Sequence, residues 1–176
     1  MQKMYFISGV SGVGKTVVME HLKSLLSDGY EVHDFDERGV PDNADHTWRL
    51  DETRNWIALG HKKAEENIKL VICGFSNPDE IDEIVKEFPN LKVQTILLDG
   101  EDSIIEQRLR KRNEDTAARV DLERAVGRSA DAFIESNTKF VPILREICHR
   151  HNCPTIDTSH LDPEMVAERV AGLIEQ

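Results

Sequence analysis

The stretch that decides the fold of this chain is Gly9-Val10-Ser11-Gly12-Val13-Gly14-Lys15-Thr16. It fits the pattern G-x-x-x-x-G-K-[ST], in which glycines let a loop turn tightly and expose its backbone N–H groups. The apolar run at 4–8 predicts a buried strand before the loop, and 15–26 predicts a helix after it. A strand, this loop and a helix, in that order, predict a phosphate-binding site at the helix N-terminus.

Nucleotide and magnesium binding follow together from this motif. The loop amides would surround the phosphates, Lys15 would reach the β- and γ-phosphates, and the Thr16 hydroxyl would ligate Mg²⁺. The residues that we expect to bind ATP here are Gly9, Val10, Ser11, Gly12, Val13, Gly14, Lys15, Thr16 and Val17. A glycine-rich turn without function is the alternative, and the strand-loop-helix context argues against it.

Apolar runs and helical segments alternate along the rest of the chain. Further strands are predicted at 31–35, 69–73, 93–98 and 154–156. Helices are predicted at 47–67 as one or two pieces, 78–88, 103–112, 129–151 with a possible bend at Pro142, and 163–174, while 113–128 reads as a charged segment. Buried strands separated by helices predict an α/β fold with a five-stranded parallel sheet, helices on both faces, and a ligand site at the carboxyl ends of the strands.

Length and composition favour one domain over 1–176 and limit its partners. The chain carries 39% hydrophobic and 31% charged residues, which is typical of a globular protein. Three cysteines, and no export signal after Met1, predict a cytoplasmic protein. No apolar stretch approaches the roughly 20 residues that span a bilayer. The net charge of −11 makes nucleic acid an unlikely partner and favours a small-molecule acceptor.

Two aspartates follow the second predicted strand, in His33-Asp34-Phe35-Asp36. The period of two in a strand would place Asp34 and Asp36 on the same side, at the ligand edge of the sheet. Paired carboxylates there suit magnesium coordination by Asp34 and activation of a hydroxyl by Asp36. The alternative is a solvated acidic loop that continues into Glu37.

Candidate substrate-binding residues lie in the helical region 37–67 and after the third strand. Gly74 would allow close approach of a ligand to the backbone. Aromatic and cationic side chains suited to a base, sugar or carboxylate are His46, Trp48, Arg49, Arg54 and Trp56. Trp48 and Trp56 would instead be packing residues if one helical face carries both to the core.

The one dense basic cluster, Arg108-Leu109-Arg110-Lys111-Arg112, ends a predicted helix in an otherwise acidic chain. Its arginines would stabilise charge on a transferring phosphoryl group, with Arg119, Arg124 and Arg128 as further candidates. The segment 111–128 is where we expect a lid that excludes water. A solvated, salt-bridged helix end is the alternative. A zinc site in Cys148–Cys153 is disfavoured, because that segment lacks a paired C-x-x-C element.

Taken together, these motifs resemble those of the P-loop small-molecule kinases, such as gluconate kinase, shikimate kinase and, more distantly, the nucleoside monophosphate kinases. The resemblance spans nearly the whole chain and depends on the phosphate loop, Asp34-x-Asp36, Gly74, and Leu98-Asp99 followed by Arg108 and Arg112. Only the phosphate loop is highly specific.

The resemblance implies a three-layer P-loop NTPase fold with strand order 2-3-1-4-5 and a lid. Arg108 would lie near the adenine together with 155–159. Arg112 would stand at the start of the lid over the phosphates, and Asp36 would approach the acceptor hydroxyl. Shikimate itself is disfavoured, because Phe75-Ser76 replaces a longer glycine run and no R-P lid motif is present.

These observations predict an ATP- and Mg²⁺-dependent kinase for a nucleoside, nucleotide or sugar-acid type of acceptor, acting as a monomer or homodimer. The predicted catalytic residues are Lys15, Asp36 and Arg112; Thr16 and Asp34 hold the metal; Asp36, Arg49, Arg54 and Gly74 bind the substrate. Two alternatives stay open. One is a nucleotide-dependent switch or ATPase, although no guanine-reading N-K-x-D occurs, and the other is a polynucleotide-end kinase.

Overall fold

A computed structural model of the protein describes residues 2–42 and 44–175. Within them, five parallel strands form one sheet in the order β2-β3-β1-β4-β5. The strands are β1 (Gln2–Ser8), β2 (Tyr30–Asp34), β3 (Lys69–Cys73), β4 (Leu91–Asp99) and β5 (Thr155–Asp157). The helices are α1 (Lys15–Leu25), α2 (His46–Glu65), α3 (Pro78–Val85), α4 (Asp102–Arg112), α5 (Thr116–Val126), α6 (Ala130–Arg150) and α7 (Pro163–Ile174). The predicted fold class and strand order are confirmed.

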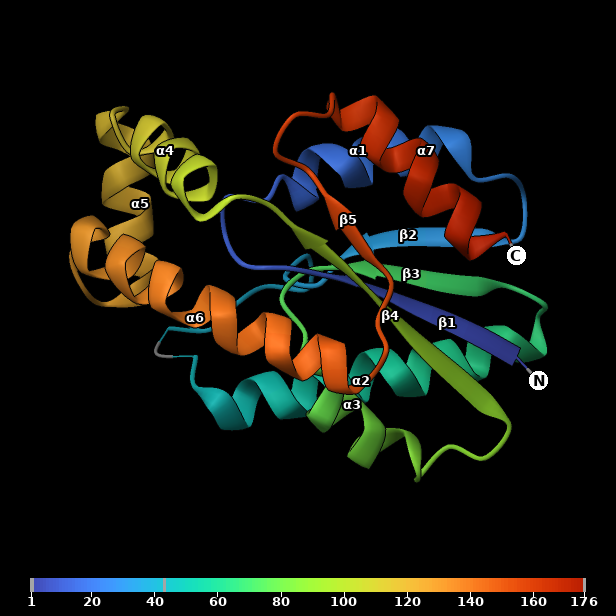
Figure 1. Ribbon diagram of the computed structural model, residues 1–176. Coiled ribbons are helices and arrows are strands. Elements are labelled where there is room, and N and C mark those ends of the chain that lie inside the picture. The colour runs from blue at the N-terminus through green and yellow to red at the C-terminus, as the bar shows by residue number, and fades with distance from the viewer. Residues whose placement is uncertain (1, 43, 176) are drawn as a thin grey trace.

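Helices cover the sheet on both faces, giving three layers (Figure 1). Helices α1 and α7 pack together on one face, while α2, α3 and α6 lie on the other. Helices α4 and α5 lie beyond the carboxyl end of β4, next to the first half of α6. The carboxyl ends of the strands therefore open onto a space that helices border on several sides.

Strand β1 contributes to both clusters of the hydrophobic core, because its side chains alternate between the two faces of the sheet. Tyr5 and Ile7 belong to the cluster that includes residues of α1 and α7, whereas Met4 and Phe6 belong to the cluster that includes residues of α2 and α3. All four are fully buried. The Tyr5 hydroxyl donates a hydrogen bond to the Ile174 carbonyl at 2.8 Å, which satisfies its polar group and joins α7 to the central strand.

Most predicted elements are present, with boundaries shifted by a few residues. The region predicted as one or two helices is the single helix α2, which starts at the cap Asp45, whose side chain accepts a hydrogen bond from the Trp48 amide at 2.9 Å. Helix α6 runs through Pro142 without ending there. Among the described residues, no helix is long and apolar enough to cross a bilayer.

The charged segment before α6 is helical, which corrects the sequence interpretation. Asp115 is the N-cap of α5, and its side chain accepts a hydrogen bond from the Ala118 amide at 2.9 Å. Gly127, with φ of 65°, is the C-cap. It buries none of its side chains, so no apolar period marks it in the sequence. The caps stabilise its helical conformation, and so does an ion pair between Arg119 and Glu123, which lie one turn apart.

A methyl group at Gly74 would collide with the Cβ of Phe35, so this position needs glycine for packing. We expect Gly74→Ala to lower the free energy of unfolding by about 1–3 kcal/mol, as overpacked cores do. Urea denaturation would measure the change. The control is Gly172→Ala at an exposed position of α7, where an added Cβ meets nothing within 4 Å. This change should raise the free energy of unfolding by about 0.5–1 kcal/mol. Unchanged stability of Gly74→Ala would contradict the packing role.

Candidate active site

The phosphate loop joins the end of β1 to the start of α1. Gly12 and Gly14 both have φ of 95°, a left-handed conformation that favours glycine. Gly14 has no side chain with which to cap α1, so the first amides of the helix remain available to an anion. The Lys15 ammonium donates to the carbonyl oxygens of Gly9 and Val10 at 2.8 and 2.9 Å, which holds it over the loop.

A pocket of about 670 Å³ opens above this loop, within the size range of small-molecule sites. Its walls come from the loop, the ends of β2 and β3, helix α2 and helix α4. The lining residues are Ser11, Gly12, Gly14, Lys15, Thr16, Val17, Asp34, Asp36, Arg49, Cys73, Gly74, Phe75, Arg108, Leu109 and Arg112. Of the predicted loop residues, Val13 lies in the core instead, while Gly9 and Val10 contribute the carbonyls that hold Lys15.

The two aspartates predicted after the second strand both reach this pocket. Asp34 ends β2, and its Oδ1 accepts a hydrogen bond from the Asp36 amide at 2.8 Å. Glu37 is occupied elsewhere: its carboxylate lies 2.6 Å from His33 Nδ1 and accepts the Asp34 amide at 3.1 Å. Asp34 and Asp36 are therefore positioned by a hydrogen-bonded turn, whereas the strand period that we used to predict their orientation ends at Asp34.

Charges in the pocket shift the protonation of two groups. Burial lowers the pKa of Lys15 to about 8, against the opposing attraction of Asp34 and Asp36. Partial burial also raises the pKa of Asp36 above its ordinary value, although Arg49 opposes the change. A lysine that loses solvation in this way is stabilised in its charged form when phosphate oxygens replace water.

Oxygen ligands for a magnesium ion converge in the same pocket. Thr16 is exposed in the first turn of α1, and the carboxylates of Asp34 and Asp36 line the pocket with it. Hydroxyl and carboxylate oxygens are the protein ligands that Mg²⁺ prefers, normally one or two of them beside phosphate and water. The residues present fit this ion.

Three arginines face the pocket without a carboxylate partner among residues 2–42 and 44–175. Arg49 lies over the rings of Phe35 and Phe75, 5.1 and 5.5 Å from their centroids. Arg108 donates to the Thr158 hydroxyl at 3.1 Å and to the Thr158 carbonyl at 2.7 Å, which ties α4 to the turn after β5. Arg112 is exposed in the last turn of α4 and lines the pocket. Unpaired cations in so acidic a chain are typical of an anion site.

Two other predicted residues lie outside the pocket. Arg54 forms ion pairs with Glu87 at 3.2 Å and with Asp51 at 3.3 Å and does not line the pocket, so the structure gives its predicted substrate role no support. His46 is exposed and pairs with Glu80 at 3.0 Å. Their partners Glu80 and Glu87 lie in α3 and just after it, and neither side chain lines the pocket.

The tryptophans are packing residues, in agreement with the structural alternative considered above. Trp56 is 1% exposed and donates its indole N–H to the Phe35 carbonyl at 3.0 Å. Trp48 is half-buried and meets the Phe35 ring edge-on at 6.4 Å. Phe35 also occupies the space beside Gly74, so that glycine serves packing as well as the pocket wall.

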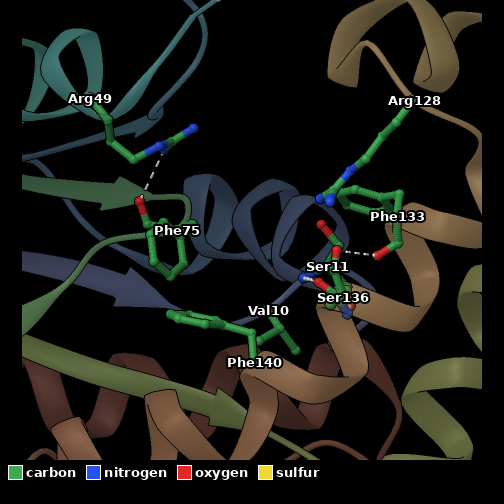
Figure 2. Close-up of a pocket in the computed structure, with 9 residues that line it drawn as sticks. Val10, Ser11, Arg49, Phe75, Arg128, Phe133, Ser136 and Phe140 are labelled. Carbon is green, nitrogen blue, oxygen red and sulfur yellow. Dashed lines mark hydrogen bonds between the residues drawn. The ribbon is translucent and has the colours of Figure 1, made fainter.

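A second chamber of about 430 Å³ adjoins the pocket, and the sequence interpretation missed it (Figure 2). It shares Ser11, Arg49 and Phe75 with the larger pocket. The remaining lining residues are Val10, Arg128, Phe133, Ser136, Asn137 and Phe140. Those on α6 follow the spacing i, i+3, i+4, i+7 of one helical face, which by itself predicts a core-facing stripe.

Asn137 of α6 binds the phosphate loop through both ends of its amide. Its Oδ1 accepts the Ser11 N–H at 3.0 Å, and its Nδ2 donates to the Ser11 carbonyl at 3.0 Å. These bonds join residues 126 positions apart, so no local sequence pattern announces them. The loop is thereby attached to the helix that lines the second chamber.

Within the described part of the chain, no group of three or more His, Cys, Asp or Glu side chains could hold a metal ion. In the segment considered for zinc, His151 lies between two carboxylates, 2.6 Å from Asp79 and 2.9 Å from Asp82. These carboxylates, the closer of which is Asp79, raise the pKa of His151.

Comparison with solved structures assigns the architecture. Over 99% of its length, the chain is similar to a sugar kinase from Janibacter sp. HTCC2649 (18% identity, TM-score 0.65, 95% of that chain covered). Over the same 99% of its length, it is similar to a shikimate kinase from Acinetobacter baumannii (17% identity, TM-score 0.60, 93% of that chain covered). It is also similar over that length to a gluconokinase from Sinorhizobium meliloti 1021 (16% identity, TM-score 0.60, 93% of that chain covered). No protein-family profile matches the sequence, and no curated protein matches it. The chain thus has the fold of the P-loop small-molecule kinases.

Because Lys15 has a pKa of about 8, we expect nucleotide affinity to fall as pH rises through that value. The protonated ammonium binds phosphate, so affinity should be highest below pH 8 and drop by roughly an order of magnitude from pH 7.5 to 9. Calorimetric titration with Mg²⁺ and ATP would measure it. Lys15→Arg retains its charge over this range and should show a flat profile. A flat profile in the unaltered protein would contradict the assignment.

Removal of the Asn137 amide should loosen the phosphate loop. Asn137→Ala leaves the Ser11 N–H and carbonyl without these partners, so we expect ATP to bind about five- to tenfold more weakly, equivalent to one or two lost hydrogen bonds. Thr138→Ala, at the next position, loses only a bond to its own helix at 3.0 Å and is the control. If both variants bind ATP equally well, Asn137 does not position the loop.

Proposed function

We propose that this protein is a kinase that transfers the γ-phosphoryl group of ATP to a small-molecule acceptor in the presence of Mg²⁺. The observation that carries the proposal is the convergence of the phosphate loop, the Asp34–Asp36 turn and three unpaired arginines on one pocket. The fold shared with a sugar kinase, a shikimate kinase and a gluconokinase supports it. We further propose that it acts in the cytoplasm as a monomer or homodimer.

Each group in the pocket has a role in this reaction. The loop amides and Lys15 bind the β- and γ-phosphates, and Arg108 borders the adenine together with the turn after β5. Thr16 and Asp34 would hold Mg²⁺, which offsets phosphate charge when bound. Arg112 neutralises charge that develops on the transferred group.

Asp36 is the group that accepts the proton. As the acceptor oxygen bonds to the γ-phosphorus, the bond from that phosphorus to the β–γ bridging oxygen breaks and ADP leaves. The acceptor hydroxyl loses its proton to the Asp36 carboxylate, whose pKa is raised by partial burial. Arg49 and Gly74 border the acceptor, and the segment 111–128, which contains α5, closes over the site as a lid.

Asp36→Asn should abolish transfer while ATP still binds. The amide preserves the size of the side chain but cannot accept the proton, so we expect kcat to fall by about 10²–10⁴-fold. The assay is ADP release with ATP and Mg²⁺ across nucleosides, nucleoside monophosphates, sugar acids and other hydroxyl compounds. The exposed Asp28→Asn is the matched control and should retain full activity.

Two results would contradict this proposal in whole or in part. The first is slow ADP release that no acceptor accelerates, which would favour a nucleotide-dependent switch. The second is acceptor-dependent turnover that persists in Asp36→Asn, which would retain the kinase but remove Asp36 as its base.

A further inference from the structure

The second chamber adjoins the nucleotide pocket, in which the acceptor of the proposed reaction has to reach the γ-phosphate. It shares Ser11, Arg49 and Phe75 with the nucleotide pocket, so a molecule inside it adjoins the phosphate loop directly (Figure 2). Its volume of about 430 Å³ is enough for a compound of one or two rings. The chemistry of its walls therefore indicates the class of acceptor.

Aromatic rings dominate these walls. Phe75 and Phe140 meet edge to face, with centroids 5.5 Å apart, and Phe133 lies across the chamber from them in Figure 2. All three are only half-buried, so each leaves apolar surface that a ligand would cover. Rings offer flat contact surface to another flat, apolar body.

Polar groups that could bind a sugar are few in this chamber. The Ser136 hydroxyl donates to the Phe133 carbonyl at 3.0 Å, and the Asn137 amide is occupied by the Ser11 backbone. Beyond the hydroxyls of Ser11 and Ser136 and the two arginines, the described lining residues offer no free side-chain partner. A polyol with more hydroxyl groups than these would bury the rest without partners, at a cost of about 1–3 kcal/mol for each. The lining therefore disfavours sugar acids, although a gluconokinase is among the structural neighbours.

Two arginines border the chamber without a carboxylate partner among residues 2–42 and 44–175. Arg128 lies over the Phe133 ring at 5.6 Å, and Arg49 donates a long hydrogen bond, 3.4 Å, to the Phe75 carbonyl. Neighbouring arginines are paired: Arg110 with Glu106, Arg119 with Glu123, and Arg124 with Asp121. The contrast within so acidic a chain points to an anion between Arg49 and Arg128.

On the basis of the proposed kinase function, we infer that the acceptor is an anionic compound with a flat, aromatic body. Its ring lies among Phe75, Phe133 and Phe140, and its anionic group lies between Arg49 and Arg128. The group that receives the phosphoryl faces Asp36 at the opening between the two cavities. Aromatic hydroxy acids and nucleoside monophosphates have both the ring and the anionic group. Polyol acids lack the ring, and neutral aromatic alcohols lack the anionic group.

Calorimetric binding to the full chain, with Mg²⁺ and a non-hydrolysable ATP analogue, tests the inference without turnover. The probes are 4-(hydroxymethyl)benzoate, its neutral amide, gluconate, and the four common nucleoside monophosphates. We expect the benzoate or a nucleotide to bind about tenfold more tightly than the amide and gluconate, which is the usual size of a charge-assisted hydrogen bond. The tighter of the two arms identifies the anion as carboxylate or phosphate.

The variant Arg128→Gln should weaken binding of the preferred anion about tenfold and leave binding of the amide unchanged. Arg150→Gln, in the last turn of α6 and already paired with Asp79 at 3.0 Å, is the matched control and should have no effect. Phe140→Leu keeps an apolar side chain at this position but removes the ring. It should weaken binding of both the benzoate and its amide.

Three outcomes would overturn the inference. The first is that gluconate or the amide binds as tightly as the aromatic anions, and the second is that no aromatic anion binds while the ATP analogue binds normally. The third is equal binding by the Arg128→Gln and Arg150→Gln variants. ADP release separates this result from the proposed function. Turnover with gluconate would retain the kinase and reject this acceptor class. The expected binding pattern without any ADP release would retain the chamber assignment and reject the kinase.

Discussion

The site depends on the parallel pairing of β1 between β3 and β4. Phe6 aligns with Ile72 on one side and Thr95 on the other, so the strands end together at one edge of the sheet. The next strand along the chain, β2, lies beyond β3, whereas β4 lies on the opposite side. The chain thus leaves β1 at the point where the strand order changes direction, and a crevice forms there. The phosphate loop occupies that crevice because it directly follows the central strand.

Although the protein as a whole is acidic, unpaired cations gather at this crevice, where they favour the binding of an anion. Most arginines elsewhere are neutralised locally, as in the pair of Arg145 with Asp99 at 2.6 Å. Around the crevice, Arg49, Arg112 and Arg128 face cavities without such a partner in the described ranges. The net charge of −11 repels polyanions at long range, and the unpaired cations act over a few ångströms. This arrangement supports our proposal that a small anion binds here.

Helix α2 shows where interpretation along the sequence succeeds and where it does not. Arg49 and Arg54 look equivalent in the sequence, but five residues on a helix rotate a side chain by about 140°. Arg49 consequently faces the pocket, whereas Arg54 faces Glu87, which is 33 positions away. The segment 113–128 was similarly hard to interpret, because α5 buries no side chain and so carries no apolar period.

The sequence by itself determined the fold class, the strand order through family resemblance, and the edge of the sheet that carries the phosphate loop, Asp34 and Asp36. Those features follow from local patterns: a glycine-rich motif, and apolar runs whose length and spacing are read along the chain. Only the tertiary structure decided that α6 binds Ser11 through Asn137 and that aromatic residues form a second chamber. The physical reason is that these contacts join residues 65 to 126 positions apart, as Phe75 with Phe140 and Ser11 with Asn137 do. In addition, a helical stripe that lines a cavity has the same period as one that packs in a core.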